Sequence, residues 1–341
     1  MTTRFPLFAF GPKRALAILG ALIAGATLFP ITASCADEKP GVLAADAPKG
    51  LRIFTCAHSF HSFVPGILAE VAKSAGIAGH EQVGVSSIGG SRVIQHWDLV
   101  DEKHQAKAVL ASGKVDVLTL SPIWMPDDGI EKFARLALEH NPDIRITVQE
   151  FWMPNDEYVP VYPLQAGKGI DHNATDLAKL HQANDQYCHD VEEYVGNLNR
   201  QLGKPVLLVV PVGAAADTLR DKLAAGQAPG LKMPWDLFRD SWGHPDAPLQ
   251  ALDAYCHYAV IYRRSPVGLP MPKVLAAMKV VGLDGQQKVR PRGPGATPAP
   301  STPAGGQEIS MADKEKLNRL LQEIAWETVT HHPLTGLGEG K

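Results

Sequence analysis

The sequence predicts an α/β fold in which helices cover both faces of a parallel sheet. Short apolar segments alternate along the chain with longer amphipathic ones, which is the pattern of repeated strand–helix–strand units. Several of the short segments are apolar at nearly every position, as strands buried on both faces are. The predicted strands are Leu51–Ala57, Gln82–Ser87, Val115–Ser121, Ile144–Trp152 and Pro205–Val212.

The amphipathic segments predict the helices of the two outer layers. Apolar residues at helical spacing, within Phe63–Ala75 and Ile130–Leu138, mark the buried faces of helices after the first and third strands. The segment Thr175–Leu202 precedes the fifth strand, and a further helix, Leu249–Tyr262, follows it. In such sheets the carboxyl ends of the strands form the edge that binds ligands, so we expect the chemistry there.

A helix near the end of the chain is expected to pack back onto this domain. Ser310 and Asp313 resemble a capping pair, and apolar residues within Leu317–Ala325 form one stripe. His331 and His332 follow, and we expect them in a solvated tail. The predicted organisation is a leader (1–36), a linker (37–50), one domain (51–283), a flexible Pro/Gly-rich insertion (284–307), a helix (308–330) and a tail (331–341).

The first 36 residues have the order of a secretory signal peptide. A positive start that ends in Lys13 and Arg14 precedes the apolar run Ala15–Ile31, and small residues lead to a cleavage site after Ala36. This predicts export to the periplasm or the extracellular space, with no membrane span after cleavage. Two alternatives stay open: a retained N-terminal anchor, and a lipoprotein acylated at Cys35.

The composition excludes several classes of protein. The chain of 341 residues has 33 Lys and Arg against 36 Asp and Glu, so its net charge of −3 provides no basic field for nucleic acid. Its content of 45% hydrophobic and 7% aromatic residues excludes a disordered chain. Four cysteines exclude a disulfide-stapled mini-domain, and cleavage leaves Cys56, Cys188 and Cys256, which we expect to be buried free thiols.

Three polar segments follow predicted strands or precede the last helix of the domain. Ser59 lies between the first strand and a helix amino terminus, where backbone amides stabilise an anion. Gly89 and Gly90 form a turn whose backbone can approach a ligand closely. Asp240 and His244 share a loop before Leu249–Tyr262. Together they predict a nucleophile, an oxyanion-binding turn and a base at one sheet edge.

These segments resemble the sequence blocks of the SGNH/GDSL hydrolase superfamily, in the branch whose first block reads Gly-Asn-Ser-Phe or similar. The matching segments are Ala57–Phe60, with Ser59 as nucleophile, Gly89 or Gly90 as the oxyanion glycine, and Asp240–Pro245, with one extra residue between Asp240 and His244. The resemblance extends over Leu51–Pro270. It implies a three-layer α/β/α fold with a five-stranded, flavodoxin-like parallel sheet, and hydrolysis of an acetyl or acyl ester of a carbohydrate or lipid.

The resemblance also implies the roles of the residues. His244 takes the proton of Ser59 and later returns it to the leaving alcohol, and Asp240 orients the imidazole. The implied partner is a small-molecule or carbohydrate ester. Cys56, His58 and His61 are a conceivable metal set, but they need not converge, and we predict neither a metal nor a cofactor.

Two departures from the family's blocks affect the oxyanion site. Ala57 and His58 replace the usual residues of the first block, and His58 is expected to have a structural role or to line the pocket. The third block, which supplies an Asn donor in the family, has no Asn here; Ser121, Gln149 and Asn155 are the candidate replacements. Loss of one donor costs roughly 3 kcal/mol of transition-state stabilisation.

Other interpretations remain open. Ser59 is also a suitable helix N-cap. The chain as a whole can be a binding protein that has lost turnover on the same scaffold, or a structural protein whose Pro-rich segment is the functional part.

Overall fold

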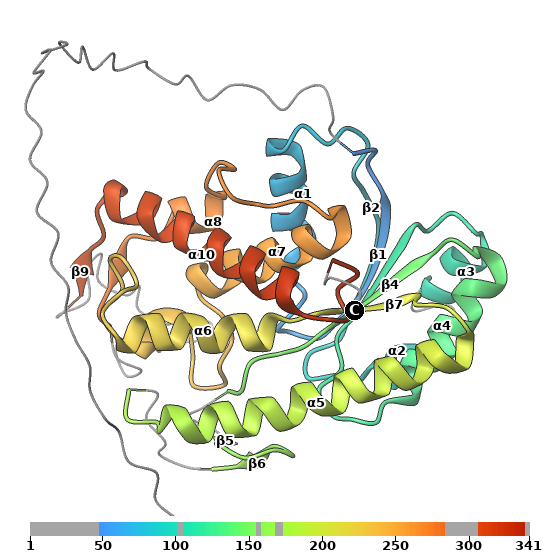
Figure 1. Cartoon of the computed structure of the whole chain (residues 1–341), viewed down its shortest axis with the longest axis horizontal. Coiled ribbons are helices and arrows are strands. Elements are labelled where there is room, and N and C mark those ends of the chain that lie inside the picture. The colour runs from blue at the N-terminus through green and yellow to red at the C-terminus, as the bar shows by residue number, and fades with distance from the viewer. Residues whose placement is uncertain (1–47, 101–104, 155–157, 168–172, 284–305, 338–341) are drawn as a thin grey trace, which may run out of the picture. The chain divides into compact units, whose positions relative to one another are not determined.

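A five-stranded parallel sheet forms the centre of the fold in the computed structural model, which describes residues 48–100, 105–154, 158–167, 173–283 and 306–337 (Figure 1). Its strands are β1 (Arg52–Ala57), β2 (Glu81–Ser87), β3 (Val117–Leu120), β4 (Arg145–Gln149) and β7 (Leu207–Val210). The strand order is β2-β1-β3-β4-β7, and every pair is parallel. This is the flavodoxin-like order, with its switch point between β1 and β3.

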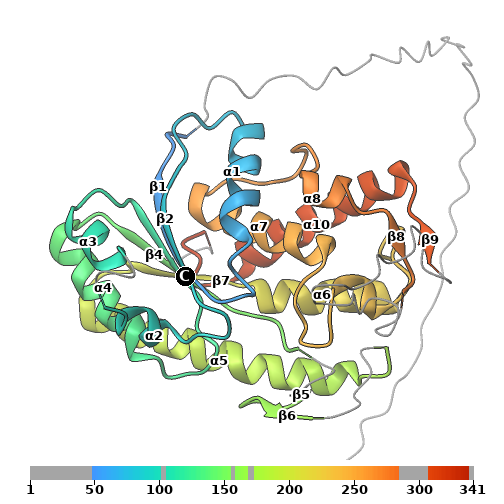
Figure 2. The ribbon, with the colours of Figure 1, turned by 180° about the vertical axis from the view of Figure 1, so that it is seen from behind.

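Helices cover both faces of the sheet, which confirms the predicted three-layer α/β/α fold (Figures 1 and 2). One layer contains α1 (Val64–Ser74), α6 (Val212–Ala224), α7 (Ala247–Tyr262) and α10 (Met311–His331). The other contains α2 (Val93–Trp97), α3 (Ala106–Ala111), α4 (Asp128–His140) and α5 (Leu177–Leu202). Short elements complete the described chain: η1 (Pro234–Leu237), α8 (Lys273–Ala276), and the pairs β5 (Tyr158–Val159) with β6 (Gln165–Ala166) and β8 (Val280–Val281) with β9 (Gln307–Glu308).

Strands such as β3 and β7 are buried at successive positions because each face of the sheet has its own core. In β1, Ile53 joins the core on the α7 side and Phe54 joins the core on the α4 side. Neighbouring side chains of a strand point to opposite faces, so a sheet covered on both sides needs apolar residues at both. Two polar residues of the sheet interior pair with each other: the Thr119 hydroxyl donates to the Thr55 hydroxyl at 3.0 Å.

Helix α7 is the central helix of its layer. Every residue of α7 except Gln250 is buried, and the helix packs against α1, α6 and α10. A helix that is apolar on all sides is typical of such a position. Asp253 and His257 are nevertheless inside it, each with no exposed surface.

The end of the chain corrects one prediction. As predicted, the Ser310 hydroxyl caps α10 by accepting a hydrogen bond from the Asp313 amide at 3.1 Å. The described residues after α10 (332–337), however, are no solvated tail: the Leu334 carbonyl accepts a hydrogen bond from the Val209 amide at 2.9 Å, and Thr335 is fully buried. The reason is that β7 is an edge strand, whose outward amides need acceptors when they are covered.

Several predictions fall on residues outside the described ranges. These are the leader (1–36) with the alternative acylation site at Cys35, most of the linker, residues 284–305 of the insertion and residues 338–341. Cys56, Cys188 and Cys256 are buried free thiols, as predicted. None of the helices in the described ranges combines the length and the apolar composition needed to cross a bilayer.

Candidate functional site

Ser59 lies in a tight turn between β1 and α1. The amides of His61 and Ser62 both donate to the carbonyl oxygen of His58, at 3.0 Å each. Helix α1 begins only at Val64, and within the described part of the chain the Ser59 hydroxyl makes no hydrogen bond. The alternative that Ser59 is the N-cap of this helix is therefore wrong, and its half-buried hydroxyl is available for chemistry.

Asp240 holds the imidazole of His244. The Nδ1 atom of His244 lies 2.9 Å from each carboxylate oxygen of Asp240, and the His244 amide donates to the same carboxylate at 3.3 Å. Burial acts to raise the pKa of Asp240, but the hydrogen bonds and charge of His244 outweigh it and hold that pKa below its ordinary value. When Nδ1 carries the proton, Nε2 is the nitrogen that can accept one. No described residue forms a hydrogen bond with Nε2 of His244.

Hydrogen bonds within the loop and to Trp152, which follows β4, hold the loop that carries Asp240 and His244. The Arg239 amide donates to the His244 carbonyl at 2.9 Å, and the indole Nε1 of the buried Trp152 donates to the Gly243 carbonyl at 2.9 Å. Gly243 has a φ of +80°, and a Cβ there would lie 2.8 Å from the Cβ of Pro154. The loop therefore requires glycine at this position.

The Ser59 turn and the Asp240–His244 loop meet through Phe60. The Phe60 ring stands edge-on to the His244 imidazole, with centroids 5.4 Å apart, and stacks on Trp152 at 4.8 Å. Two sequence segments that are about 180 residues apart thus lie at the same edge of the sheet. No hydrogen bond joins Ser59 to His244 in the described structure; such bonds are often long before substrate binds.

The glycine turn lies next to the Ser59 turn. The Ile88 amide donates to the Ala57 carbonyl at 3.0 Å, which ties the turn to the end of β1. Gly90 has a φ of +63°. The amides of Ser59, Gly89 and Gly90 donate to no acceptor among the residues that the structure describes. They are therefore free to stabilise an anion.

A buried histidine supports this glycine turn. The two ring nitrogens of His96 contact the hydroxyls of Ser86 and Ser91, each at 2.8 Å. These serines lie on either side of the turn, so His96 clamps its two ends together. His96 therefore has a structural role in this turn.

Of the predicted side-chain donors, Ser121 and Gln149 lie beneath the Ser59 turn. The Ser121 hydroxyl is 3.4 Å from the His58 amide, and it is buried. Gln149 donates through Nε2 to the Phe60 carbonyl at 3.1 Å, and its Oε1 is 2.9 Å from the Nε2 of His257. Both residues support the turn from the interior. Asn155 is outside the described residues.

His58, expected to have a structural role or to line the pocket, is only 2% exposed. Its Nδ1 accepts a hydrogen bond from the Phe60 amide at 3.1 Å. Burial, with smaller contributions from His96 and His244, lowers the pKa of His58 to about 3, so the ring is neutral. His58 therefore acts as a neutral acceptor that shapes the turn.

A buried group of two imidazoles and a carboxyl behind this turn was missed by sequence reasoning. The rings of His61 and His257 stack with centroids 4.9 Å apart, and the Nε2 of His257 lies 3.4 Å from Asp253. Burial raises the pKa of Asp253 well above its ordinary value, and neither of its oxygens accepts a hydrogen bond from a described residue. The available signal was an Asp and a His four residues apart inside an otherwise apolar helix.

Within the described residues, Cys56, His58 and His61 form no group whose ligand atoms converge. Within the described ranges, one group of three potential ligands brings its ligand atoms within 4.8 Å of one another, and it consists of Glu150, Glu192 and His332. This group lies around the end of β4 and α5.

Two surface cavities lie away from the candidate catalytic residues. One, of about 330 Å³, adjoins Lys49, Arg145 and Tyr262 near the amino-terminal ends of β1 and β4. The other, of about 550 Å³, runs along α5 between His181 and His189. Neither is lined by the Ser59 turn or the Asp240–His244 loop, so neither identifies a substrate pocket.

Comparison with known proteins leaves the family open. No protein-family profile matches the chain, and no curated protein is detectably similar to it. The chain is similar in structure to a DUF4886 family protein from Bacteroides uniformis, with 12% sequence identity and a TM-score of 0.45 over 83% of this chain and 95% of that one.

Proposed function

We propose that this protein is a serine hydrolase that cleaves esters. The observation that carries the proposal is the Asp240–His244 pair, whose imidazole contacts the ring of the residue that directly follows Ser59. A hydroxyl, an imidazole with an orienting carboxylate, and free backbone amides at one sheet edge are the parts that acyl transfer needs. The resemblance of the three sequence segments to the SGNH/GDSL blocks supports the same assignment.

The reaction proceeds in two steps. Nε2 of His244 takes the Ser59 proton while Oγ forms a bond to the ester carbonyl carbon, whose oxygen becomes the oxyanion. Collapse of this intermediate breaks the bond to the alcohol, which leaves with the proton from His244. Water then attacks the acyl-Ser59 ester and gives a proton to His244; the bond to Oγ breaks, His244 returns this proton to Oγ, and the acid leaves.

Backbone amides supply the oxyanion stabilisation in this mechanism. The amides of Ser59 and of Gly89 or Gly90 are the donors, because Ser121 and Gln149 are engaged beneath the turn. A missing side-chain donor costs roughly 3 kcal/mol, or about a hundredfold in rate. We therefore propose a slow hydrolase relative to enzymes that have this donor.

An aromatic surface beside His244 supports a substrate with a ring. The Trp242 side chain is 52% exposed, and its ring lies 6.1 Å from that of Tyr158. Exposed indole faces bind the apolar faces of rings while polar groups stay hydrated. The aromatic surface therefore favours the acetyl or acyl ester of a carbohydrate as substrate. An enzyme that is exported to the periplasm or the extracellular space would meet such esters there.

Hydrolysis of p-nitrophenyl acetate and of an acetylated oligosaccharide tests the proposal. Wild-type protein is compared with Ser59→Ala and with Ser62→Ala, a matched control because Ser62 is exposed in the same turn. We expect Ser59→Ala to lose at least about 1,000-fold in kcat and Ser62→Ala to keep the wild-type value. Equal turnover by both variants would exclude Ser59 as the nucleophile.

A non-catalytic binding protein on the same scaffold is the second candidate. The observation that favours it is the engagement of Ser121 and Gln149 in support of the turn, which leaves the oxyanion to backbone amides alone. This candidate predicts that folded wild-type protein binds the acetylated oligosaccharide without turnover, and that Ser59→Ala leaves this affinity unchanged.

A further inference from the structure

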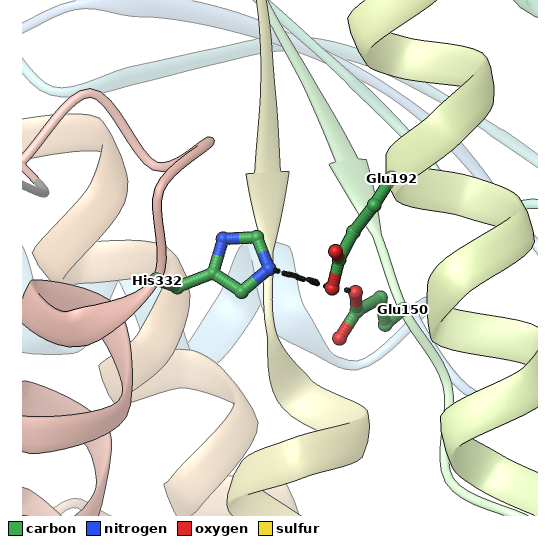
Figure 3. A group of neighbouring side chains, drawn as sticks. All are labelled: Glu150, Glu192 and His332. Carbon is green, nitrogen blue, oxygen red and sulfur yellow. Dashed lines mark hydrogen bonds and ion pairs between the residues drawn. The ribbon is translucent and has the colours of Figure 1, made fainter. Parts of the chain in front are cut away.

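Glu150, Glu192 and His332 meet at the β7 side of the sheet. Figure 3 shows Glu150 just beyond β4, Glu192 on α5 and His332 just beyond α10, with their polar atoms turned toward one another. The Nε2 of His332 lies 3.1 Å from Glu192 and 4.0 Å from Glu150. Three elements that are far apart in sequence thus direct ligand-type atoms to a single point.

The carboxyl of Glu150 is the unusual member of this group. It is only 1% exposed, and neither oxygen accepts a hydrogen bond of normal geometry from a described residue, although the Cys188 thiol lies beside it. A carboxylate in this position is costly unless a positive charge compensates it. Glu192 brings a second carboxylate to the same point, and one imidazole cannot compensate both.

We propose that Glu150, Glu192 and His332 bind a divalent zinc ion. One nitrogen and two carboxylate oxygens form a donor set that suits zinc, whereas calcium and magnesium prefer oxygen ligands alone. Ligand atoms that lie roughly 2.0–2.2 Å from a tetrahedral zinc ion are roughly 3.4 Å from one another. The Nε2 atom of His332 is already at similar distances from the two carboxylates, 3.1 Å from Glu192 and 4.0 Å from Glu150. The side chain of Glu192 is 34% exposed, which provides the path of entry.

Zinc binding has a structural signature at the end of the chain. The Nδ1 of His332 accepts a 3.2 Å hydrogen bond from the Leu334 amide, so its Nε2 carries the proton in the neutral ring. Ligation through Nε2 moves the proton to Nδ1 and releases this contact. The ion then links α10 to α5 and β4 in its place. The zinc proposal does not rest on the proposed hydrolase chemistry.

Zinc titration of the full chain, after chelator treatment, tests the proposal. Calorimetry gives the stoichiometry and affinity, and thermal unfolding gives the shift in Tm. We expect one zinc ion per chain, a rise in Tm with zinc, and faster hydrogen exchange at the Leu334 amide. Glu150→Gln and His332→Gln should each weaken binding at least about tenfold.

His331→Gln is the matched control, because His331 is the adjacent imidazole but is exposed, and among the described residues its ring hydrogen-bonds to the carbonyl of Glu327. It should bind zinc like the wild type. Glu150→Gln removes a buried charge and is expected to fold, so loss of zinc binding in this variant is informative. Absence of saturable binding, or binding that survives both ligand substitutions, would overturn the proposal. A loss in His331→Gln equal to that in His332→Gln would do the same.

Discussion

The Phe60 ring meets the imidazole of His244 edge-on, with 5.4 Å between the ring centroids. Phe60 also stacks on Trp152, and the Trp152 indole donates a hydrogen bond to the loop that carries His244. Three aromatic rings therefore set the position of the Ser59 turn relative to the Asp240–His244 loop. Packing, instead of a direct hydrogen bond, aligns the two halves of the candidate site.

Trp152→Phe should loosen this alignment. The substitution keeps most of the stacked surface but leaves the Gly243 carbonyl without its donor, which we expect to cost about 1–2 kcal/mol of unfolding free energy. Ester hydrolysis should fall as well, because the His244 loop loses its attachment. Urea denaturation and kcat measure the two effects. Trp326→Phe is the control; an equal loss of kcat in this variant would contradict a specific role for Trp152.

Asp240→Asn should abolish most of the activity with little effect on stability. The side-chain amide of Asn no longer holds the proton on Nδ1 of His244. The equivalent Asp-to-Asn substitution in a serine protease lowers kcat about 10,000-fold. Arg239→Gln is the control, since Arg239 is exposed and lies 3.9 Å from the same carboxylate. If Arg239→Gln were as damaging as Asp240→Asn, the effect would not act through His244.

Asp253→Asn should stabilise the protein at alkaline pH. Burial raises the pKa of Asp253 well above its ordinary value, so folding takes up a proton and stability falls as the pH rises above about 4 toward the raised pKa. The neighbouring imidazoles do not compensate, because burial lowers the pKa of His61 and takes that of His257 to about 3. Asparagine removes this pH dependence.

Burial also raises the pKa of Glu150, to about 7, so Glu150 contributes to the pH dependence of stability. Because Glu150 is present in both proteins, its contribution cancels in the difference in unfolding free energy between Asp253→Asn and the wild type. We expect the difference to favour the variant by about 1–3 kcal/mol at pH 8 and to shrink toward pH 5. Urea denaturation at both values measures it. A variant that is less stable at pH 8, with an unchanged pH slope, would show that Asp253 is compensated in the native state.

The layered fold could be predicted from the sequence because its cause is local. Strand β3 is an apolar run and α5 has an apolar stripe, so both were predictable from their own residues. The short helices α2 and α3 carry no such stripe. Their placement depends on tertiary contacts such as the Asp127 carboxylate, which accepts hydrogen bonds from the Val93 and Ile94 amides at 2.7 and 2.9 Å.

The candidate site was only partly predictable. Asp240 and His244 are four residues apart, so their pairing follows from local geometry. The positions of Glu150 and His332 do not, because they depend on how the chain end packs on β7. The prediction of a solvated tail failed for the same reason: the unpaired outer edge of β7, which the Leu334 carbonyl now meets, is a property of the sheet and not of the tail.

Reaction with a fluorophosphonate, followed by peptide mapping, tests the central claim most directly. The activated serine of a hydrolase attacks the phosphorus and displaces fluoride, so the label marks the nucleophile. We predict one label per chain, on Ser59, at a rate that falls when His244 is replaced by Gln. Folded protein that stays unlabelled, or that carries its label on another serine, would contradict the assignment.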